Sequence, residues 1–311
     1  MFDRQHIQRP AIRRLIEDQA AFLRAFGERQ VLLMRPEDPP VELLSLEIID
    51  ELLSCSLLKV PFGNLTDVRG NVPVASFTRT LRTLATNSAG HIDGNKVIEQ
   101  MKKGRTLVLS GLEQWHAPVV RYLAEIAVVF PGTLLEGAAF ITPPDAQGLP
   151  VHRDPGHLFI VQINGSKDWR VYTPPKNGYW HVGEIRDAEE IAFDGSLSPG
   201  DVLYLPAGAP HVVRGQTGLS VHLSLGVSEP PSEMILRAFK EQLVIPESVE
   251  PRPADDEALA VASSDFIEAL VKRLENTDST ELATAARLFF AHPLPNPSEQ
   301  AFVRWARGLD G

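Results

Sequence analysis

A histidine and an aspartate two positions apart, His152 and Asp154, are residues whose types and spacing could carry chemistry. Residues two apart on a β-strand point to the same face, so this imidazole and this carboxylate can converge on one point. Such a pair predicts little by itself, because a surface pair or an ordinary hydrogen bond would have the same spacing. The pair gains weight only beside a second motif.

The second motif runs from Gly200 to His211 and has the pattern Gly-x5-Pro-x-Gly-x2-His. The turn at Pro199 and Gly200 begins a buried strand, and Pro206 with Gly208 makes a tight corner. His211 then begins the next strand with its ring directed into a barrel. The pattern is similar to the second motif of cupin barrels, and a barrel with a purely structural histidine is the alternative.

Together the two motifs supply two imidazoles and one carboxylate. This is the facial triad of non-haem Fe(II) oxygenases, which leaves coordination positions open for a bidentate keto acid and O₂. Ordinary cupins more often have a second histidine and then a glutamate after the first, whereas Asp154 stands in that place here and no glutamate follows within five residues. The sequence therefore predicts a metal site at His152, Asp154 and His211 and favours an oxygenase over an isomerase-type or storage cupin.

Lys167 lies fifteen residues after His152, just beyond a turn at Asn164 and Gly165. An ammonium group on the returning strand could bind the distal carboxylate of 2-oxoglutarate. A solvated lysine in a turn is the alternative, and the spacing leaves both interpretations open.

Further along the chain, His222 alternates with Ser220 and Ser224 on an expected strand, so its ring could line the same pocket. His157 matches no ligand position.

These motifs resemble those of the JmjC-type ribosomal oxygenases, the cupin-4 family. The similarity is strong from about Gly104 to Val227 and weaker upstream, where residues 29–34 look like the family's early strand. The residues that carry it are Thr142-Pro143-Pro144, Gln147-Gly148, His152, Asp154, Phe159, Gln162, Gly165, Lys167, Trp169-Arg170-Val171-Tyr172, Pro199 to Pro206, and His211.

The resemblance implies a 2-oxoglutarate-dependent hydroxylase of histidyl or arginyl side chains that uses Fe(II) and O₂ and releases succinate and CO₂. It implies that His152, Asp154 and His211 are the iron ligands and that Lys167 binds the C5 carboxylate of 2-oxoglutarate. Demethylation is also possible, since hydroxylating an N-methyl group releases it. The family further implies a homodimer formed through the C-terminal helices, and a helical lid on the barrel is the alternative.

The chain departs from the family in several places. Residues 155–159 read Pro-Gly-His-Leu-Phe where the family often has Asp-His-Asp-Val-Phe, and Ala138 occupies the place of a cosubstrate-binding asparagine. Thr142, Tyr204 or Ser224 could compensate as cofactor-binding residues. The C-terminal part is also short for the family's dimerisation region plus winged helix, so the substrate could instead be a peptide natural product or a free amino acid.

Composition limits the classes of partner. The chain has 311 residues and a net charge of −10, and from Ser228 onward it has 15 acidic against 8 basic residues. This acidity argues against nucleic acid and is compatible with a basic protein or peptide substrate. A single cysteine, Cys55, excludes an internal disulfide, and we expect no signal peptide, no membrane span and a cytoplasmic location.

The pattern along the chain predicts a mainly β fold with flanking helices, in which a double-stranded β-helix is followed by a C-terminal helical region. We expect a mixed helix and strand part over 1–130, the β-helix core with the metal site over 131–229, and helices over 230–311. Strands are predicted at 134–141, 158–163, 169–172, 202–205, 211–213 and 219–225, and long helices at 11–26 and 112–129. Ser264, Ser279 and Ser298 are expected helix N-caps.

Two other functions fit the motifs. One is a metal cupin of another class, a dioxygenase that needs no keto acid. The other is a non-catalytic JmjC-like module that binds a partner. The presence of Lys167 together with all three predicted metal ligands argues against the second, because a binding module has no need of them.

Overall fold

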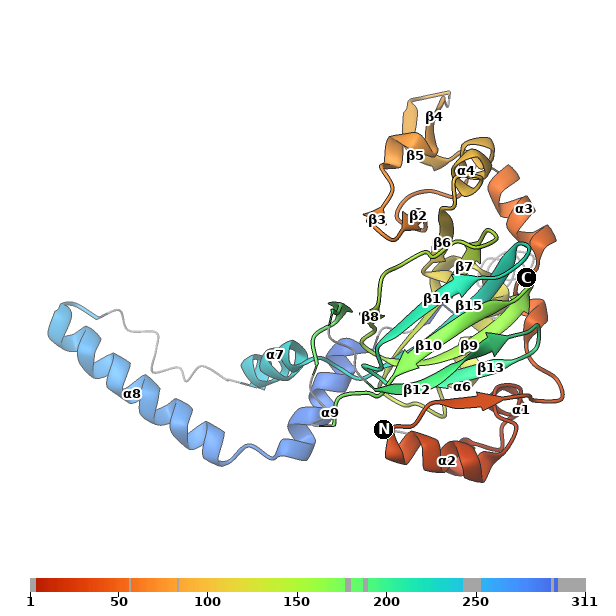
Figure 1. The fold of residues 1–311 in the computed structure, drawn as a ribbon. Helices are drawn as coiled ribbons and strands as arrows, with labels where there is room; N and C mark the ends of the chain where they lie inside the picture. The colour runs from red at the N-terminus through yellow and green to blue at the C-terminus, as the bar shows by residue number, and fades with distance from the viewer. Residues whose placement is uncertain are drawn as a thin grey trace, which may run out of the picture. The chain divides into compact units, whose positions relative to one another are not determined.

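A computed structural model gives the fold (Figure 1). It describes residues 4–55, 57–82, 84–176, 180–186, 190–242, 253–291 and 294–295. Residues 2–131 and 135–228 belong to one compact unit, and residues 229–292 with 132–134 belong to a second. The boundaries predicted at residues 131 and 230 stay predictions.

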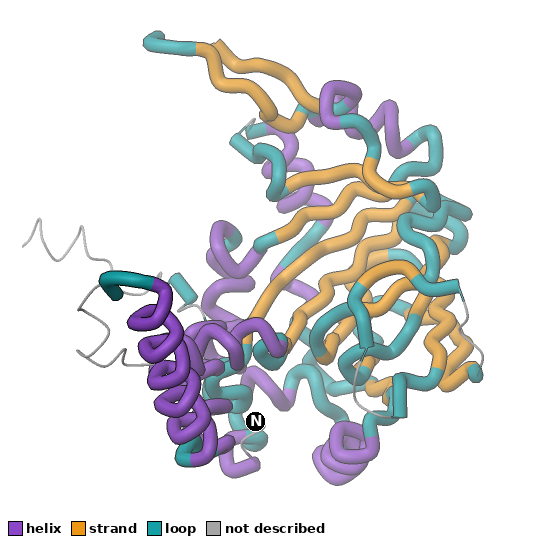
Figure 2. The backbone as a smooth tube through the Cα atoms, turned by 90° about the vertical axis from the view of Figure 1, so that its left-hand side faces the viewer, coloured by secondary structure: helices purple, strands orange, loops and turns teal. Residues whose placement is uncertain are grey.

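The first unit is built around a large antiparallel sheet and a smaller one (Figure 2). The eight strands of the large sheet are, in order across it, β1 (Leu32–Met34), β13 (Val202–Leu205), β9 (His157–Asn164), β15 (Ser220–Ser228), β7 (Leu134–Thr142), β6 (Thr106–Ser110), β2 (Gly63–Asp67) and β3 (Gly70–Asn71). The five strands of the small sheet are β11 (Gly183–Glu184), β8 (His152–Arg153), β14 (His211–Gly215), β10 (Lys167–Tyr172) and β12 (Ile191–Leu197). A separate hairpin consists of β4 (Thr78–Arg82) and β5 (Asn87–Ile92).

Six α-helices of the described residues belong to the same unit as the large sheet. They are α1 (Pro10–Arg13), α2 (Gln19–Glu28), α3 (Leu46–Ser54), α4 (Gly94–Met101), α5 (Leu112–Trp115) and α6 (Ala117–Ile126), with short 3-10 helices at Arg4–His6, Val41–Leu43 and Val74–Ser76. Apolar residues of α1, α2 and α6 form one core with the large sheet, as shown by the fully buried Ile12, Phe22 and Leu123 beside Phe159 and Leu223. These helices therefore cover one face of that sheet.

The other face of the large sheet turns toward the small sheet. Ile160 and Leu203 share a second core with Trp169, Val171 and Leu197 of the small sheet. Because side chains alternate along a strand, Ile160 faces this core while its neighbours on β9 face the helices. The same alternation along β7 and β15 leaves one face of each strand for the site between the sheets.

Two helices predicted as continuous are interrupted. The expected helix over 11–26 is divided into α1 and α2, because Asp18 adopts an extended conformation and caps α2 by accepting the backbone N–H groups of Ala20 and Ala21. The expected helix over 112–129 is divided into α5 and α6 at His116, which is also extended. The ring of His116 instead hydrogen-bonds the carbonyl oxygen of Leu43 at 2.8 Å.

The second unit is helical, with α7 (Ser232–Gln242), α8 (Asp256–Glu275) and α9 (Ser279–Phe290). Asp255 and Asp278 cap α8 and α9, so the cap predicted at Ser279 is wrong by one residue. The cap predicted at Ser264 is wrong, since that residue lies inside α8, and Ser298 lies outside the described residues. None of the described helices combines the length and apolar character needed to cross a bilayer.

Candidate active site

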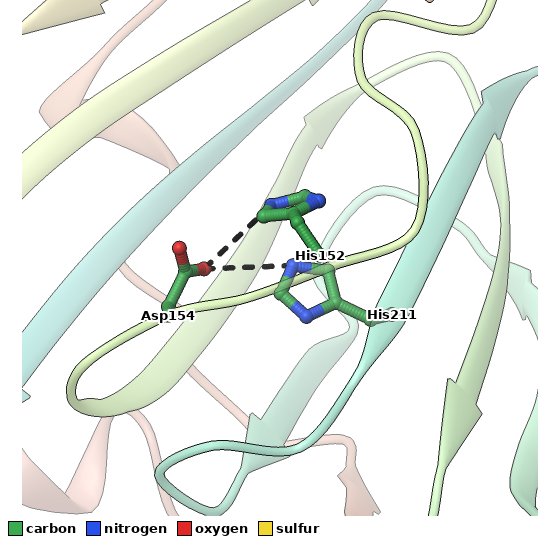
Figure 3. Close-up of side chains that lie close together, drawn as sticks. All are labelled: His152, Asp154 and His211. Atoms are coloured by element: carbon green, nitrogen blue, oxygen red, sulfur yellow. Dashed lines mark ion pairs between the residues drawn. The ribbon is translucent and has the colours of Figure 1, made fainter. Parts of the chain in front are cut away.

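The small sheet brings the predicted metal ligands together. In the register of β8 and β14, His152 lies directly opposite His211, and Asp154 follows two residues after His152. The three side chains converge on one point (Figure 3). Asp154 Oδ2 lies 3.5 Å from His211 Nε2 and 3.9 Å from His152 Nε2. One ligand atom from each residue lies within 4.8 Å of the others.

Backbone carbonyls fix the orientation of both imidazoles. His152 Nδ1 lies 2.9 Å from the oxygen of Pro150, and His211 Nδ1 lies 3.1 Å from the oxygen of Ala209. A carbonyl oxygen can only accept a hydrogen bond, so each Nδ1 carries the hydrogen and each Nε2 keeps its lone pair. Both lone pairs are therefore available on the ring atoms nearest Asp154, as metal ligation requires.

Burial favours the neutral form of His211. The ring is 4% exposed. Loss of solvation lowers the pKa of His211 below its usual value, the charge of Asp154 acts in the opposite direction, and His152 lowers it further. A neutral imidazole is the form that binds a metal ion.

The donor set fits a divalent transition metal. The separations of 3.5 and 3.9 Å are longer than a hydrogen bond, so these groups do not satisfy one another directly. A divalent metal ion could be held between the three groups, since imidazole nitrogens and carboxylate oxygens are common ligands of such ions. Two imidazoles and one carboxylate on one side of an ion leave the opposite positions open. The site could therefore hold Fe(II) together with a chelating ligand.

A cavity of about 320 Å³ lies beside these three residues. Its size falls within the range of small-molecule sites. Alternate residues of β7 and β15 supply much of its wall, as the period of a strand requires. These residues are Glu136, Ala138, Phe140 and Thr142 from β7 and His222, Ser224, Gly226 and Ser228 from β15. The predicted positions of Thr142, Ser224 and His222 are thus all in the cavity wall.

Lys167 is a buried lysine in the same cavity. Its side chain is fully buried, and Nζ donates to the carbonyl oxygen of Phe140 at 2.8 Å and lies 2.8 Å from His222 Nδ1. Loss of solvation lowers the pKa of Lys167 well below its usual value. No ion pair joins Lys167 to a carboxylate in the described part of the chain. A lysine in this setting is suited to receive an anionic ligand.

Trp169 offers a further unsatisfied group in the cavity wall. Its ring is 1% exposed and stacks near His211, with 5.8 Å between ring centroids. No described group accepts a hydrogen bond from its buried Nε1. Buried donors almost always find a partner in native proteins. Like Lys167, this residue is suited to a cavity that holds a polar molecule.

Tyr204 does not join the cavity, although it was predicted as a possible cofactor contact. Leu203 and Leu205 face the small sheet, so the alternation along β13 directs Tyr204 toward the helices. Its ring packs at 5.2 Å from that of Phe22, and its hydroxyl lies 2.8 Å from His157 Nδ1. The same contact gives His157 a structural role.

A clamp around the Pro206–Gly208 corner has no signal in the sequence. The Arg29 guanidinium donates to the carbonyl oxygens of Pro175 and Ala207 at 2.7 and 2.9 Å and lies 5.4 Å from the Trp180 ring centroid. Trp180 packs so close to Gly208 that a Cβ there would lie 2.5 Å from the indole. Gly208 N–H in turn donates to the carbonyl oxygen of Asp154 at 3.2 Å. The clamp thereby supports the backbone of a predicted metal ligand.

Part of the chain that includes the site matches a known protein family. A model described as the JmjC domain matches residues 114–235, which include all three predicted ligands, Lys167 and His222. Residues 114–235 are therefore similar to the JmjC domain.

Two curated proteins similar to the chain are named as a hydroxylase and an oxygenase. The bifunctional lysine-specific demethylase and histidyl-hydroxylase NO66 of Drosophila mojavensis is 26% identical over 215 residues, which cover 66% of this chain and 23% of that protein. Ribosomal oxygenase 2 of Bos taurus is 30% identical over 182 residues, which cover 53% of this chain and 39% of that protein. The chain thus spans well under half the length of either relative. The resemblance to ribosomal oxygenases is confirmed.

Solved structures have the same fold over residues well beyond the matched range. Escherichia coli ycfD has a TM-score of 0.54 at 19% identity, with 83% of this chain and 68% of that chain covered. The Escherichia coli ribosomal oxygenase YcfD in complex with cobalt and 2-oxoglutarate has a TM-score of 0.53 at 17% identity, with 81% and 66% covered. The predicted mainly β fold with flanking helices and a C-terminal helical region is confirmed.

Proposed function

We propose that the chain is an Fe(II)- and 2-oxoglutarate-dependent oxygenase that hydroxylates an amino-acid side chain of a protein or peptide and releases succinate and CO₂. The observation that carries the proposal is the arrangement of the cavity. Two imidazole lone pairs and a carboxylate converge beside it, and a buried lysine with no carboxylate partner among the described residues lines it. The metal and 2-oxoglutarate bound by the Escherichia coli protein agree with this arrangement.

Each residue has a defined part in this proposal. His152, Asp154 and His211 hold the metal on one side, and Lys167 binds the distal carboxylate of 2-oxoglutarate. The hydroxyl groups of Thr142 and Ser224 are available as further cosubstrate contacts. The bound iron, keto acid and O₂ supply the chemistry that inserts oxygen into a C–H bond.

Apolar residues of the cavity wall have a different role from the metal ligands and Lys167 in this proposal. Leu158, Ile160, Trp169 and Val213 line the cavity. They exclude water from the reacting centre, and they hold the two bound molecules in a fixed relation to each other.

The substrate we propose is a histidyl or arginyl side chain. Glu136 of β7 lines the cavity and is also an exposed residue, so its carboxylate lies where the cavity meets solvent. Loss of solvation and the charges of Glu113 and Asp154 raise the pKa of Glu136. A basic substrate side chain would relieve this repulsion. The histidyl-hydroxylase activity named for a relative agrees with such a substrate, and its named lysine demethylase activity leaves demethylation as a second outcome of the same chemistry.

Location and assembly complete the proposal. We propose a cytoplasmic protein that forms a homodimer through its C-terminal helices. Helix α8 has no buried residue, and Leu259, Phe266 and Ile267 are about half exposed on it. Such apolar side chains favour contact with another surface.

The test of the function is an assay for succinate formation with Fe(II), 2-oxoglutarate and O₂, followed by mass spectrometry of basic peptides, histidine-containing peptides and free amino acids. We expect a substrate-dependent product heavier by one oxygen atom. Asp154→Ala should abolish succinate formation, because the metal loses its charged ligand. Turnover that needs no keto acid would indicate the other class of metal cupin. Unchanged turnover in Asp154→Ala, or no metal binding by the wild type, would contradict the proposal.

A further inference from the structure

A further buried histidine of the cavity, His222, is not one of the three predicted metal ligands. Its side chain is 4% exposed, and its ring stacks on Phe140 with 4.9 Å between centroids and 24° between planes. Trp169 approaches the ring from another direction, with 5.1 Å between centroids and 58° between planes. Two aromatic neighbours therefore fix the plane of the imidazole.

The fixed ring meets the end of Lys167. Nζ lies 2.8 Å from His222 Nδ1 and 2.8 Å from the carbonyl oxygen of Phe140. An ammonium group has three N–H bonds and no lone pair, so a protonated Lys167 can only donate to both neighbours. Nδ1 is then the acceptor, and the hydrogen of the neutral imidazole is on Nε2. Two of the three ammonium hydrogens are engaged in this way, and the third is left for a ligand in the cavity.

The charge balance agrees with a neutral imidazole. Loss of solvation, the charge of Lys167 and the nearby His211 all lower the pKa of His222 well below its usual value. A protonated His222 would repel the ammonium group and offer no lone pair to it. The neutral ring avoids this repulsion and offers the lone pair of Nδ1 to the ammonium group.

We propose that His222 is a positioning residue that acts through Lys167. Its Nδ1 holds one ammonium hydrogen, and this contact aims the remaining hydrogen at the distal carboxylate of the cosubstrate. The inference rests on the proposed function, because that carboxylate is the group being bound. Without the imidazole, the carbonyl oxygen of Phe140 would be the one remaining hydrogen-bond partner of the ammonium group among the described residues, and the direction of that group would no longer be fixed.

Substitutions separate the two nitrogen positions of the ring. His222→Asn places an amide oxygen near the position of Nδ1, whereas His222→Gln places its amide nearer that of Nε2 and His222→Leu offers no acceptor. Anaerobic calorimetry with Mn(II) measures the affinity for 2-oxoglutarate and for 2-oxobutyrate, which lacks the distal carboxylate. We expect His222→Leu and His222→Gln to weaken 2-oxoglutarate binding about tenfold or more and His222→Asn to stay within about threefold of the wild type.

The second keto acid shows whether the effect belongs to the carboxylate end. Affinity for 2-oxobutyrate should be the same in the wild type and all three variants, which also shows that the variants are folded and bind the metal. His91→Asn is the matched control, since His91 is a buried histidine that does not line the cavity. It should leave both affinities unchanged. Equal losses for the two keto acids would overturn the inference.

Nuclear magnetic resonance of isotope-labelled histidine gives a readout independent of affinity. We expect His222 to be the Nε2–H tautomer in the complex with Zn(II) and 2-oxoglutarate, with its signals identified by their loss in His222→Asn. An Nδ1–H tautomer in that complex would overturn the inference. Failure of the wild type to bind 2-oxoglutarate with Mn(II) would instead overturn the proposed function. Normal binding by the wild type and by His222→Leu alike would overturn only the role of His222.

Discussion

Burial of Lys167 makes the stability of the fold depend on pH. Its Nζ has a carbonyl oxygen and an imidazole as neighbours, and no carboxylate pairs with it in the described chain. The fold therefore disfavours the protonated form, while the unfolded chain accepts a proton freely. This difference determines the direction in which the free energy of unfolding changes with pH.

We expect the free energy of unfolding to rise with pH as the pH approaches the ordinary lysine pKa of 10.5. The lowered pKa of folded Lys167 means that the unfolded chain binds more protons between the two pKa values, so stability increases with pH there. The penalty is present in full below the folded pKa and disappears above the unfolded one. Urea denaturation of the metal-free wild type and of Lys167→Met over this range measures the effect. Parallel pH profiles for the two proteins would show that Lys167 is not buried in this way.

Glu136 tests the substrate proposal. We expect Glu136→Gln to raise KM for a basic peptide roughly two- to fivefold at low salt and to leave kcat little changed, because a partly exposed charge contributes modestly. Steady-state kinetics at two salt concentrations measure this. Glu125→Gln on α6 replaces another exposed glutamate that does not line the cavity and should leave KM unchanged. Equal effects of the two substitutions would show that Glu136 does not recognise the substrate.

The roles of single residues could be predicted where they follow from the alternation of side chains along one strand. They could not be predicted where they depend on which residues of two strands lie opposite each other. Alternation along β15 correctly predicted that His222 lines the cavity. Tyr204 was predicted on the wrong face, because an uninterrupted run of apolar residues hides which face of β13 meets the cavity. The contact between Lys167 and His222 joins residues 55 positions apart, and only the folded sheets bring them together.

Among the elements, the corner between β13 and β14 supports the backbone of Asp154, a predicted metal ligand. Gly208 has a φ of 75°, a conformation that L side chains rarely adopt, and Trp180 covers the space where a Cβ would lie. The same glycine donates to the backbone of Asp154. Strain at this corner should therefore reach the metal site.

We expect Gly208→Ala to lower the free energy of unfolding by about 1–3 kcal/mol and to weaken Mn(II) binding. Gly27→Ala is the control, since Gly27 lies within α2 at an ordinary φ and a Cβ added there would meet no atom within 4 Å. That substitution should raise stability by about 0.5–1 kcal/mol. Denaturant unfolding and metal titration check both variants. A Gly208→Ala protein as stable as the wild type would exclude the clamp.

Strands were easier to predict than helix boundaries and short pairings. The six strands predicted from apolar runs all exist, because such runs fill both cores. The pattern did not predict β12, whose side chains are mostly exposed, or the two-residue strands β8 and β11. Asp18 and His116 interrupt helices whose apolar spacing continues across them, since local hydrogen bonds outweigh the pattern.

For the molecule as a whole, the large sheet unites distant parts of the chain. Strand β1 of the N-terminal region pairs with β13, and β6 pairs with β7. Sequence patterns indicate that segments such as β7 and β13 are strands but contain no information about such partners. The predicted metal site therefore lies in a fold whose large sheet combines strands from within residues 114–235 and strands from before them.

This architecture predicts that metal binding stabilises the folded chain. Ligands far apart in sequence meet only in the native state, so Mn(II) at about 100 times its dissociation constant should raise the free energy of unfolding by about 2.7 kcal/mol. Thermal unfolding with and without Mn(II) measures this. The increase should be absent in His211→Ala, and an equal increase in that variant would place the metal elsewhere.

The most direct test of the central claim is an anaerobic titration with Fe(II) and then 2-oxoglutarate, followed by visible absorption of the iron–keto acid chelate. We predict one Fe(II) per chain and a chelate band that saturates with 2-oxoglutarate and is lost in Asp154→Ala and His211→Ala. Wild-type protein that binds Fe(II) without forming the chelate, or a chelate that persists in both variants, would contradict the account.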